Sequence, residues 1–239
     1  MKQSNISGCN IIIEDTWIIE DDTTLTDVYI KCYTHDCIQV EPGVNFKLVK
    51  STLHAHHNGR CIIILGYSET LIKDTLIRDC GGSTTNDERG GAIRAFGSSN
   101  LKIISSRFEN NLATWGGAIA LEPLSGLFVL RSTFENNIAP SGAIIHAYQA
   151  KVDIHRSNFT NNEARNEGSI IRLNDSNGNM FNNHFYGNID ANVTGMVVKT
   201  DCHNEFQAAL YFHYNNHGID SISNGNMYGY NRCLVYVQE

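Results

Sequence analysis

The chain has 239 residues, a formal net charge of −7 and 41% hydrophobic against 18% charged residues. This composition can bury a sizeable core, which excludes a disordered chain. No apolar run is long enough for a transmembrane helix, so we expect no membrane span. An acidic chain without a Lys/Arg cluster binds nucleic acid poorly, so we expect no nucleic-acid partner.

The N-terminal segment, residues 1–10, is polar and is followed at once by the apolar run 11–13. It lacks the apolar core of a signal peptide. An intracellular protein and a secreted protein whose signal has been removed both fit this start. The run 11–13 and the segment 234–237, Leu-Val-Tyr-Val, predict strands near the two ends of the chain.

A repeat of about 26 residues dominates the middle of the chain. A Phe-x-x-Asn phrase recurs at intervals of 26, 25 and 26 residues, and a fifth phenylalanine, 27 residues later, continues the series. A Gly-Gly-Ala-Ile phrase recurs with the same period and weakens toward the C-terminus. The phenylalanines are Phe108, Phe134, Phe159, Phe185 and Phe212, and the second phrase begins at Gly90, Gly116, Ser141, Gly168 and Gly195.

Steps of 31, 24 and 23 residues extend this register toward the N-terminus and produce three nearly pure apolar columns. The first reads Ile30, Leu53, Ile77, Phe108, Phe134, Phe159, Phe185, Phe212. The second reads Leu25, Leu48, Ile72, Ile103, Val129, Ile154, Met180, and the third reads Ile38, Ile62, Ile93, Ile119, Ile144, Ile170, Val197, Leu234.

The apolar segments alternate with a period of two, which is typical of strands, and they are too short for helices. About 26 residues have room for two or three short strands and their turns, which make one coil of a solenoid. Equivalent strands then stack about 4.8 Å apart, and equal side chains form ladders. The sequence therefore predicts an all-β, right-handed parallel β-helix of about eight coils, a single domain over 1–239 with its clearest repeats at 90–188.

The turns between the strands also repeat. Asparagine tolerates the left-handed backbone conformation and can bond along a stack, which explains a column of asparagines after the phenylalanines. His56 falls in the same column. The position after the glycine is mostly small and holds Cys37 and Cys61, which would lie near disulfide distance, although we expect most cysteines to be packing residues. The asparagines are Asn111, Asn137, Asn162, Asn188 and Asn215.

The paired phrases resemble the passenger domains of chlamydial polymorphic outer-membrane proteins, well over 90–188 and by pattern alone over 25–89 and 189–237. This resemblance implies a pectin-lyase-like β-helix that acts as an adhesin or interaction scaffold at a cell surface, in contact with a protein or a glycan. The membrane barrel of that family is absent from this sequence.

Two other functions remain open. A polysaccharide lyase or hydrolase would need acids clustered on one face of the rod, but Asp153, Asp175 and Asp201 lie in successive coils without sharing a column. A virion or appendage component would stack its coils end to end, and homo-oligomeric stacking is a possible partner arrangement. We assign no catalytic residue, no cofactor and no metal.

The candidate binding surface combines loops and a polar stripe. Insertions near 81–89 and 217–230 leave the repeat, and loops on a rigid scaffold often bind. A histidine group, His54, His56 and His57 with His35, could hold a metal, but a polar turn is the preferred interpretation. The candidate binding residues are Asp87, Glu88, Arg89, His146, Arg172, Lys199, Tyr228 and Tyr230.

Overall fold

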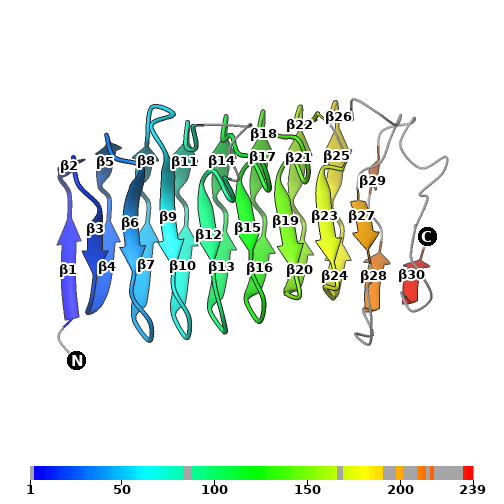
Figure 1. Ribbon diagram of the computed structural model, residues 1–239, viewed down its shortest axis with the longest axis horizontal. Helices are drawn as coiled ribbons and strands as arrows, with labels where there is room; N and C mark the ends of the chain where they lie inside the picture. The colour runs from blue at the N-terminus through cyan, green and yellow to red at the C-terminus, as the bar shows by residue number, and fades with distance from the viewer. Residues whose placement is uncertain are drawn as a thin grey trace.

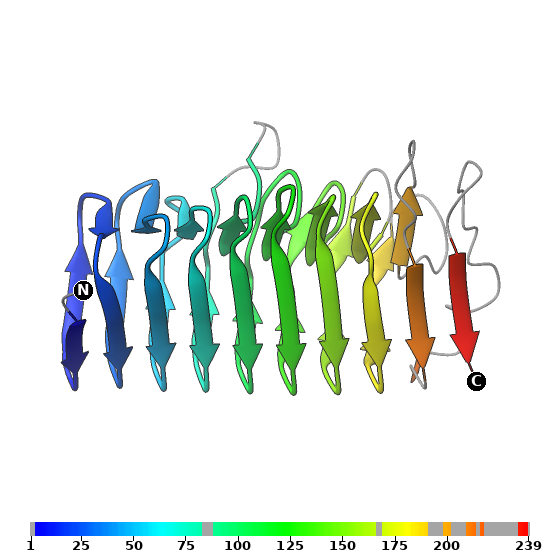
Figure 2. The same ribbon diagram turned by 90° about the horizontal axis from the view of Figure 1, so that it is seen from below.

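The strands of the computed structural model wind into a rod whose coils follow one another from the N-terminal end to β30 (Figures 1 and 2). Equivalent strands of successive coils pair in parallel, so three long sheets run along the rod. This is the right-handed parallel β-helix that the repeat predicts. The described residues contain no helix, and hence none that could span a membrane. The structure describes residues 3–82, 88–165, 169–190, 198–201, 209–213, 216–217 and 234–238.

Sheet A is the longest of the three sheets and has ten strands among the described residues. Its strands are β1 (Gln3–Ser7), β4 (Asp22–Thr26), β7 (Asn45–Val49), β10 (Glu69–Lys73), β13 (Asn100–Ile104), β16 (Gly126–Leu130), β20 (Lys151–His155), β24 (Gly178–Phe181), β28 (Ala209–His213) and β30 (Leu234–Gln238).

Sheets B and C complete each coil and have nine and eight strands in the described part of the chain. Because the three sheets do not have equal numbers of strands, the number of coils differs slightly from the eight predicted. Sheet B contains β2 (Asn10–Ile13), β5 (Tyr29–Cys32), β8 (Thr52–His54), β11 (Leu76–Arg78), β14 (Arg107–Glu109), β17 (Thr133–Glu135), β21 (Asn158–Thr160), β25 (His184–Tyr186) and β29 (Asn216–His217). Sheet C contains β3 (Trp17–Ile19), β6 (Asp36–Val40), β9 (Arg60–Ile64), β12 (Ile93–Ala95), β15 (Ile119–Leu121), β19 (Ile145–Tyr148), β23 (Ile171–Asn174) and β27 (Val198–Asp201). A short sheet pairs β18 (Ile138–Ala139), β22 (Glu163–Ala164) and β26 (Ile189–Asp190).

The core is a set of ladders formed by inward-facing side chains. The second predicted column is confirmed in sheet A, where strand register aligns its members one above another. In sheet B the phenylalanine rings stack nearly parallel, with centroids 5.0 Å apart between Phe108 and Phe134 and 5.3 Å apart between Phe134 and Phe159. Phe185 continues this ladder, 4.7 Å from Phe159.

Two members of the predicted columns belong to sheet A instead. Phe212 pairs with Met180 there, while His217 takes the place opposite Phe185 in sheet B. Leu234, predicted for the third column, pairs with Ala209 in sheet A. Both errors have one cause: the phrases weaken beyond residue 190, so spacing alone could not separate one strand from the next.

The third column is wrong by one residue from the sixth coil onward. Ile119 pairs with Ile145, not Ile144, and the offset continues to Ile171 and Val198. Backbone conformation sets this register, because Gly116 and Gly142 both adopt positive φ, at 65° and 61°. A Cβ on Gly116 would lie 2.1 Å from the Ile119 carbonyl oxygen, so glycine must stack on glycine here.

The asparagine column is confirmed, but its physical role is only half as predicted. Each buried amide donates to the next, from Asn111 Nδ2 to Asn137 Oδ1 and from Asn137 Nδ2 to Asn162 Oδ1, both at 2.9 Å. The left-handed conformation belongs to the preceding residue, such as Asn136 with φ 54°. His56 is exposed with φ 52° and does not join the buried ladder, and Asn215 lies outside the described residues.

Candidate functional site

The outward face of sheet C carries the polar stripe that the sequence predicts. Side chains alternate across a strand, so the residue after each inward isoleucine points away from the core. Register places Arg94, Ala120, His146 and Arg172 at one position of successive strands, and places Lys199 next in line. We call this row the sheet C column. Cationic groups therefore recur along the rod axis on a rigid support.

Arg94 is held in place by a carboxylate and an aromatic ring. Its Nη2 lies 2.7 Å from Glu122 Oε1, and its guanidinium sits 4.4 Å from the centre of the Phe96 ring. Arg89 Nη1 approaches the same Glu122 oxygen at 3.3 Å. One carboxylate therefore orients two guanidinium groups, and the three groups together retain a net positive charge.

A second group lies two and three strands farther along the column. The edge of the Trp115 ring meets the His146 imidazole, with centroids 5.1 Å apart, and the Arg172 guanidinium lies 5.7 Å from the centre of the same indole. Arg172 Nη1 also donates to Ser141 Oγ at 2.8 Å. His146 is buried at 6% relative exposure, whereas Trp115 is half-buried. The indole thus offers apolar surface beside the Arg172 guanidinium, above the buried His146.

Arg60 supports this face from beneath. Its Nε donates to the carbonyl oxygens of Arg89, at 2.9 Å, and Gly90, at 3.2 Å, while its Nη1 pairs with Asp36 Oδ1 at 2.9 Å. Burial lowers the pKa of Arg60, but a guanidinium stays charged at neutral pH. The segment that carries Arg89, before β12, is therefore tied to the β-helix.

The candidate residues named from the sequence fall into three groups. His146, Arg172 and Lys199 share the sheet C column. Arg89 is linked through Glu122 to Arg94 of the same column. Glu88 is buried and accepts a hydrogen bond from the Gly82 amide at 3.3 Å, so it holds the loop. The predictions for Asp87, Tyr228 and Tyr230, and most of the insertion 217–230, lie outside the described residues.

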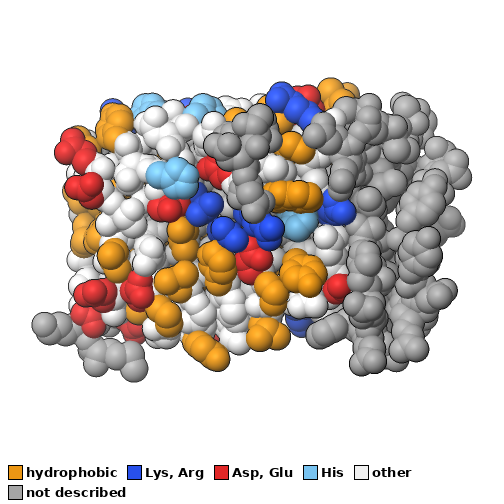
Figure 3. Space-filling model, in the orientation of Figure 1, with side chains coloured by type: hydrophobic (Ala, Val, Ile, Leu, Met, Phe, Trp, Pro, Cys, Tyr) orange, Lys and Arg blue, Asp and Glu red, His pale blue; other side chains and the backbone are white. Residues whose placement is uncertain are grey.

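Sequence reasoning missed several members of this face. Arg94 directly follows the Gly-Gly-Ala-Ile phrase, so it could have been assigned to the column of His146 once the register was known. Trp115 directly precedes Gly116, but its contacts with His146 and Arg172 join different coils, and residue spacing does not predict them. Glu122 carries no sequence signal, because it contacts Arg94 from a different coil. Phe96 lies in the same coil as Arg94, two residues later, and could have been assigned with it. Figure 3 shows Lys and Arg side chains gathered in the middle of this face, beside a histidine and hydrophobic side chains.

The acids considered for catalysis are not brought together. Asp153 faces outward on sheet A, where it accepts hydrogen bonds from Asn179. Asp175 lies in the turn after β23, and register places Asp201 opposite Asn174 in sheet C. These three positions therefore offer no paired-acid arrangement among the described residues.

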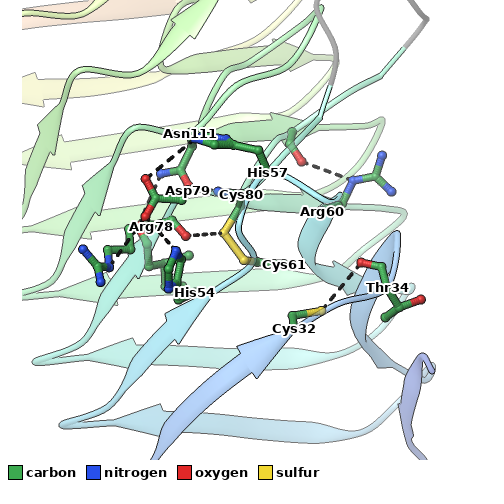
Figure 4. The surroundings of a disulfide bond; sticks show 12 residues. Cys32, Thr34, His54, His57, Arg60, Cys61, Arg78, Asp79, Cys80 and Asn111 are labelled. Atoms are coloured by element: carbon green, nitrogen blue, oxygen red, sulfur yellow. Dashed lines mark hydrogen bonds and ion pairs between the residues drawn. A yellow bond between two sulfur atoms is a disulfide. The ribbon is translucent and has the colours of Figure 1, made fainter. Parts of the chain in front are cut away.

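Two members of the histidine group, His54 and His57, lie beside the Asp79 carboxylate near the corner between sheets B and C (Figure 4). His54 Nε2 lies 2.9 Å and His57 Nε2 3.8 Å from Asp79 oxygens, and the His54 and His56 rings are 3.7 Å apart. His35 instead lies beside Asp36, at 3.3 Å. In the part of the chain that the structure describes, no three His, Cys, Asp or Glu side chains are arranged to hold a metal ion.

Acid is expected to destabilise the protein through His54. Burial lowers the pKa of His54, and His56 lowers it further; Nδ1 is buried without a hydrogen-bond partner among the described residues, so a proton there would find no acceptor. A lowered folded pKa means that stability present above the unfolded value, about 6.5, is lost as the pH falls below it. Urea unfolding at pH 7.5 and 5.5 should therefore show a smaller acid loss for His54→Gln than for the wild type.

His57→Gln is the matched control for this measurement. The His57 side chain is 48% exposed and lies on the same carboxylate at a longer distance. Its substitution should leave the acid loss of stability nearly unchanged. Equal acid losses in the wild type and in His54→Gln would show that His54 does not cause the effect.

The cysteines at this corner correct another prediction. Cys61 forms a disulfide with Cys80, 19 residues later, and not with the stacked Cys37 (Figure 4). Stacked side chains of parallel strands run side by side about 4.8 Å apart, whereas a disulfide needs converging Cβ atoms about 3.8 Å apart. Cys61 and Cys80 approach across the corner, with Cα atoms 5.6 Å apart. Cys32 and Cys37 are buried free thiols, as predicted for packing residues, and Cys9 is exposed.

Comparison with known proteins identifies the architecture. A family model described as "Right handed beta helix region" matches residues 9–165. The periplasmic alginate epimerase AlgG is similar in structure, with 11% identity over 95% of this chain and 78% of that chain and a TM-score of 0.33. A double mutant of the epimerase has 12% identity over 96% and 77% of the two chains, with a TM-score of 0.25. No curated protein matches the sequence.

Proposed function

We propose, from the premise that this chain belongs to the right-handed β-helix region family, that it is a one-domain, non-catalytic scaffold that binds an acidic glycan on sheet C. One observation carries the proposal: Arg94, His146 and Arg172 lie in one outward column, interleaved with the Trp115 ring. Guanidinium groups bind carboxylates through paired hydrogen bonds, and an aromatic ring offers a flat apolar surface to a sugar.

The rod geometry favours an extended ligand. Strands of sheet C follow one another about 4.8 Å apart, so the three steps from Arg94 to Arg172 span roughly 14 Å. Two cationic groups at that separation can contact two acidic residues of one linear polymer. Because the ladders beneath the column are rigid, little conformational entropy is lost on binding.

An extracellular or cell-surface location is part of the proposal. The Cys61–Cys80 disulfide supports it, because disulfides persist in oxidising compartments and are rare in the cytosol. Acidic glycans are accessible to a protein in such a place. The adhesin role implied by the repeat phrases fits the same location.

Binding to an acidic polysaccharide tests the proposal. Calorimetric titration with polyuronate is expected to show binding that weakens with salt, and a neutral glucan should not bind. The double variant Arg94→Gln/Arg172→Gln is expected to bind at least about 10-fold more weakly, because each charge-assisted hydrogen bond contributes roughly 1.5–3 kcal/mol.

The matched control removes the same charge elsewhere. Arg131 and Arg156 are exposed residues of adjacent coils at the corner between sheets A and B. Arg131→Gln/Arg156→Gln should leave affinity within about twofold of the wild type. If both double variants lose affinity equally, binding follows net charge and not the sheet C column.

A second candidate function is a polysaccharide lyase that uses the same face. The observation in its favour is His146, an imidazole between two guanidinium positions, because a base beside carboxylate-binding cations suits proton abstraction from a uronate. A scaffold predicts no unsaturated product after incubation with polyuronate. Product formation that disappears in His146→Ala would overturn the non-catalytic proposal in favour of this one.

A further inference from the structure

The corner between sheets C and A carries one large apolar side chain in each of four successive coils. Tyr67 and Leu124 are 78% and 71% exposed, Tyr148 is 36% exposed, and Phe96 is half-buried. These corners form the lower edge of the rod in Figure 1, and hydrophobic side chains gather toward it in Figure 3. Strands about 4.8 Å apart make this a row roughly 14 Å long. We call it the C–A edge; it comprises residues 65–68, 96–99, 122–125 and 148–150, where β9, β12, β15 and β19 lead into sheet A.

Two of these side chains are held in a backbone conformation that favours glycine. Tyr67 and Leu124 have φ 62° and 69°, and strand register places them at the turn position of Gly43, which has φ 79°. The turns 41–44 and 122–125 read Glu-Pro-Gly-Val and Glu-Pro-Leu-Ser, and in both the fourth amide donates to the first carbonyl at 3.2 Å. A Cβ in this conformation costs free energy. Strained and exposed apolar side chains indicate a surface that another molecule covers.

Opposite charges lie at the two ends of the C–A edge. Glu69 and Lys151 are the first residues of β10 and β20, beside the first and the last turn of the edge. They belong to one outward column of sheet A, whose two members between them are an asparagine and a glycine. Each has a partner in its own chain, Lys102 and Asp153, yet the two side chains remain 50% and 65% exposed. The surface is therefore apolar in its middle and oppositely charged at its ends.

We propose that a second copy of this chain covers the C–A edge, with the two rods side by side and antiparallel, not end to end. A twofold axis between the second and third turns of the edge brings Tyr67 onto Tyr148 of the partner subunit, and Phe96 onto Leu124 of the partner subunit. The same axis brings Glu69 to Lys151 of the partner subunit. A twofold interface is self-complementary, so each contact forms twice. A parallel pair in register would instead place each charge against its like.

The contact is small, so the dimer is weak. A fully covered aromatic ring buries roughly 150–250 Å². The exposed parts of four side chains and their charged neighbours therefore bury less than the about 800 Å² per partner of a standard interface. Contacts of this size belong to transient complexes, which form in the micromolar range and dissociate on dilution. The apolar row supplies the attraction, and the two ion pairs fix the orientation.

Sedimentation equilibrium of the whole protein, without glycan and between about 5 and 500 μM, tests the dimer. We expect a monomer–dimer equilibrium. The variant Tyr67→Asn/Leu124→Gly should associate at least about 10-fold more weakly, because it removes the two most exposed contacts. Its urea midpoint should nevertheless not fall, since asparagine and glycine both tolerate the left-handed conformation and Leu124→Gly copies the turn 41–44. A purely structural role of the two side chains would not separate these readouts.

Two further sets of variants test the position and the orientation. Ile12→Ser/Tyr186→Ser removes two side chains that are 64% exposed on sheet B, and should leave association within about twofold of the wild type. Glu69→Lys and Lys151→Glu should each weaken the dimer, because like charges then meet at both ends. The exchange variant Glu69→Lys/Lys151→Glu should restore it to within about twofold of the wild type.

Several results would overturn the antiparallel dimer. These are a wild type that stays monomeric over the whole range, association that survives Tyr67→Asn/Leu124→Gly, and an exchange variant as weak as the two single ones. Flotation of a monomer with phosphatidylcholine–phosphatidylglycerol vesicles that depends on Tyr67 and Leu124 would assign the edge to a membrane surface instead. None of these measurements involves the sheet C column, so the inference does not depend on glycan binding.

Discussion

Phe134→Ala is expected to lower the free energy of unfolding by about 3–5 kcal/mol, the range for deleting a large buried aromatic side chain. Phe134 is completely buried and stacks on Phe108 and Phe159, so alanine removes two ring contacts and leaves a cavity in the middle of the ladder. Urea denaturation followed by circular dichroism measures the change. Because each coil contacts only its neighbours, the two halves of the rod should also unfold less cooperatively.

Phe128→Ala is the matched control in the neighbouring strand of the same coil. Phe128 lies on the outward face of sheet A, half-buried, with its ring 5.6 Å from that of His155. Its loss should lower the free energy of unfolding by about 1 kcal/mol, since much of the ring already contacts water. Similar losses for the two variants would contradict the stacked core.

Asn137→Asp is expected to lower the free energy of unfolding by about 3 kcal/mol or more at pH 7. In the wild type, Asn137 Nδ2 donates to the Phe108 carbonyl oxygen and to Asn162 Oδ1. Aspartate has the same shape but places an oxygen against these two acceptors, and it buries a charge without a cation. The loss therefore exceeds that of one ordinary hydrogen bond.

The pH dependence of Asn137→Asp identifies the mechanism. Burial raises the folded pKa of the new carboxyl above its unfolded value of about 3.9, so the protonated form is preferred in the folded state. The loss of stability should then be smallest below pH 4 and increase as the pH rises toward the folded pKa. Asn158→Asp, at an exposed position of β21, should change stability by less than about 0.5 kcal/mol. A loss for Asn137→Asp that does not vary with pH would exclude a buried charge as its cause.

The inward ladders could be predicted from the sequence because each is a local pattern repeated at a fixed interval. Burial of a strand face requires apolar residues at every second position, and stacking repeats them in every coil. The columns through Ile103 and Phe134 were therefore correct in the middle of the chain. They failed at Ile144 and Phe212, where neighbouring apolar residues satisfy the same spacing and only the backbone decides between them.

The candidate site was predictable only in part. His146, Arg172 and Lys199 were placed in one row because they occupy the same position of the repeat. The Glu122 bridge and the Trp115 contact were not found, since each joins different coils and different faces of the repeat. Pairings between coils depend on side-chain direction, which residue spacing does not specify.

By itself the sequence determined the coil: its length, its strand pattern and the residues that fill its interior, because hydrophobic burial repeats with the chain. The tertiary structure alone decided which cysteine bonds Cys61, which backbone position takes the left-handed conformation, and which carboxylate orients Arg94. The physical reason is the same in each case. These interactions depend on the direction in which a side chain or peptide group points across a corner or between strands, and that direction exists only after the coils have stacked.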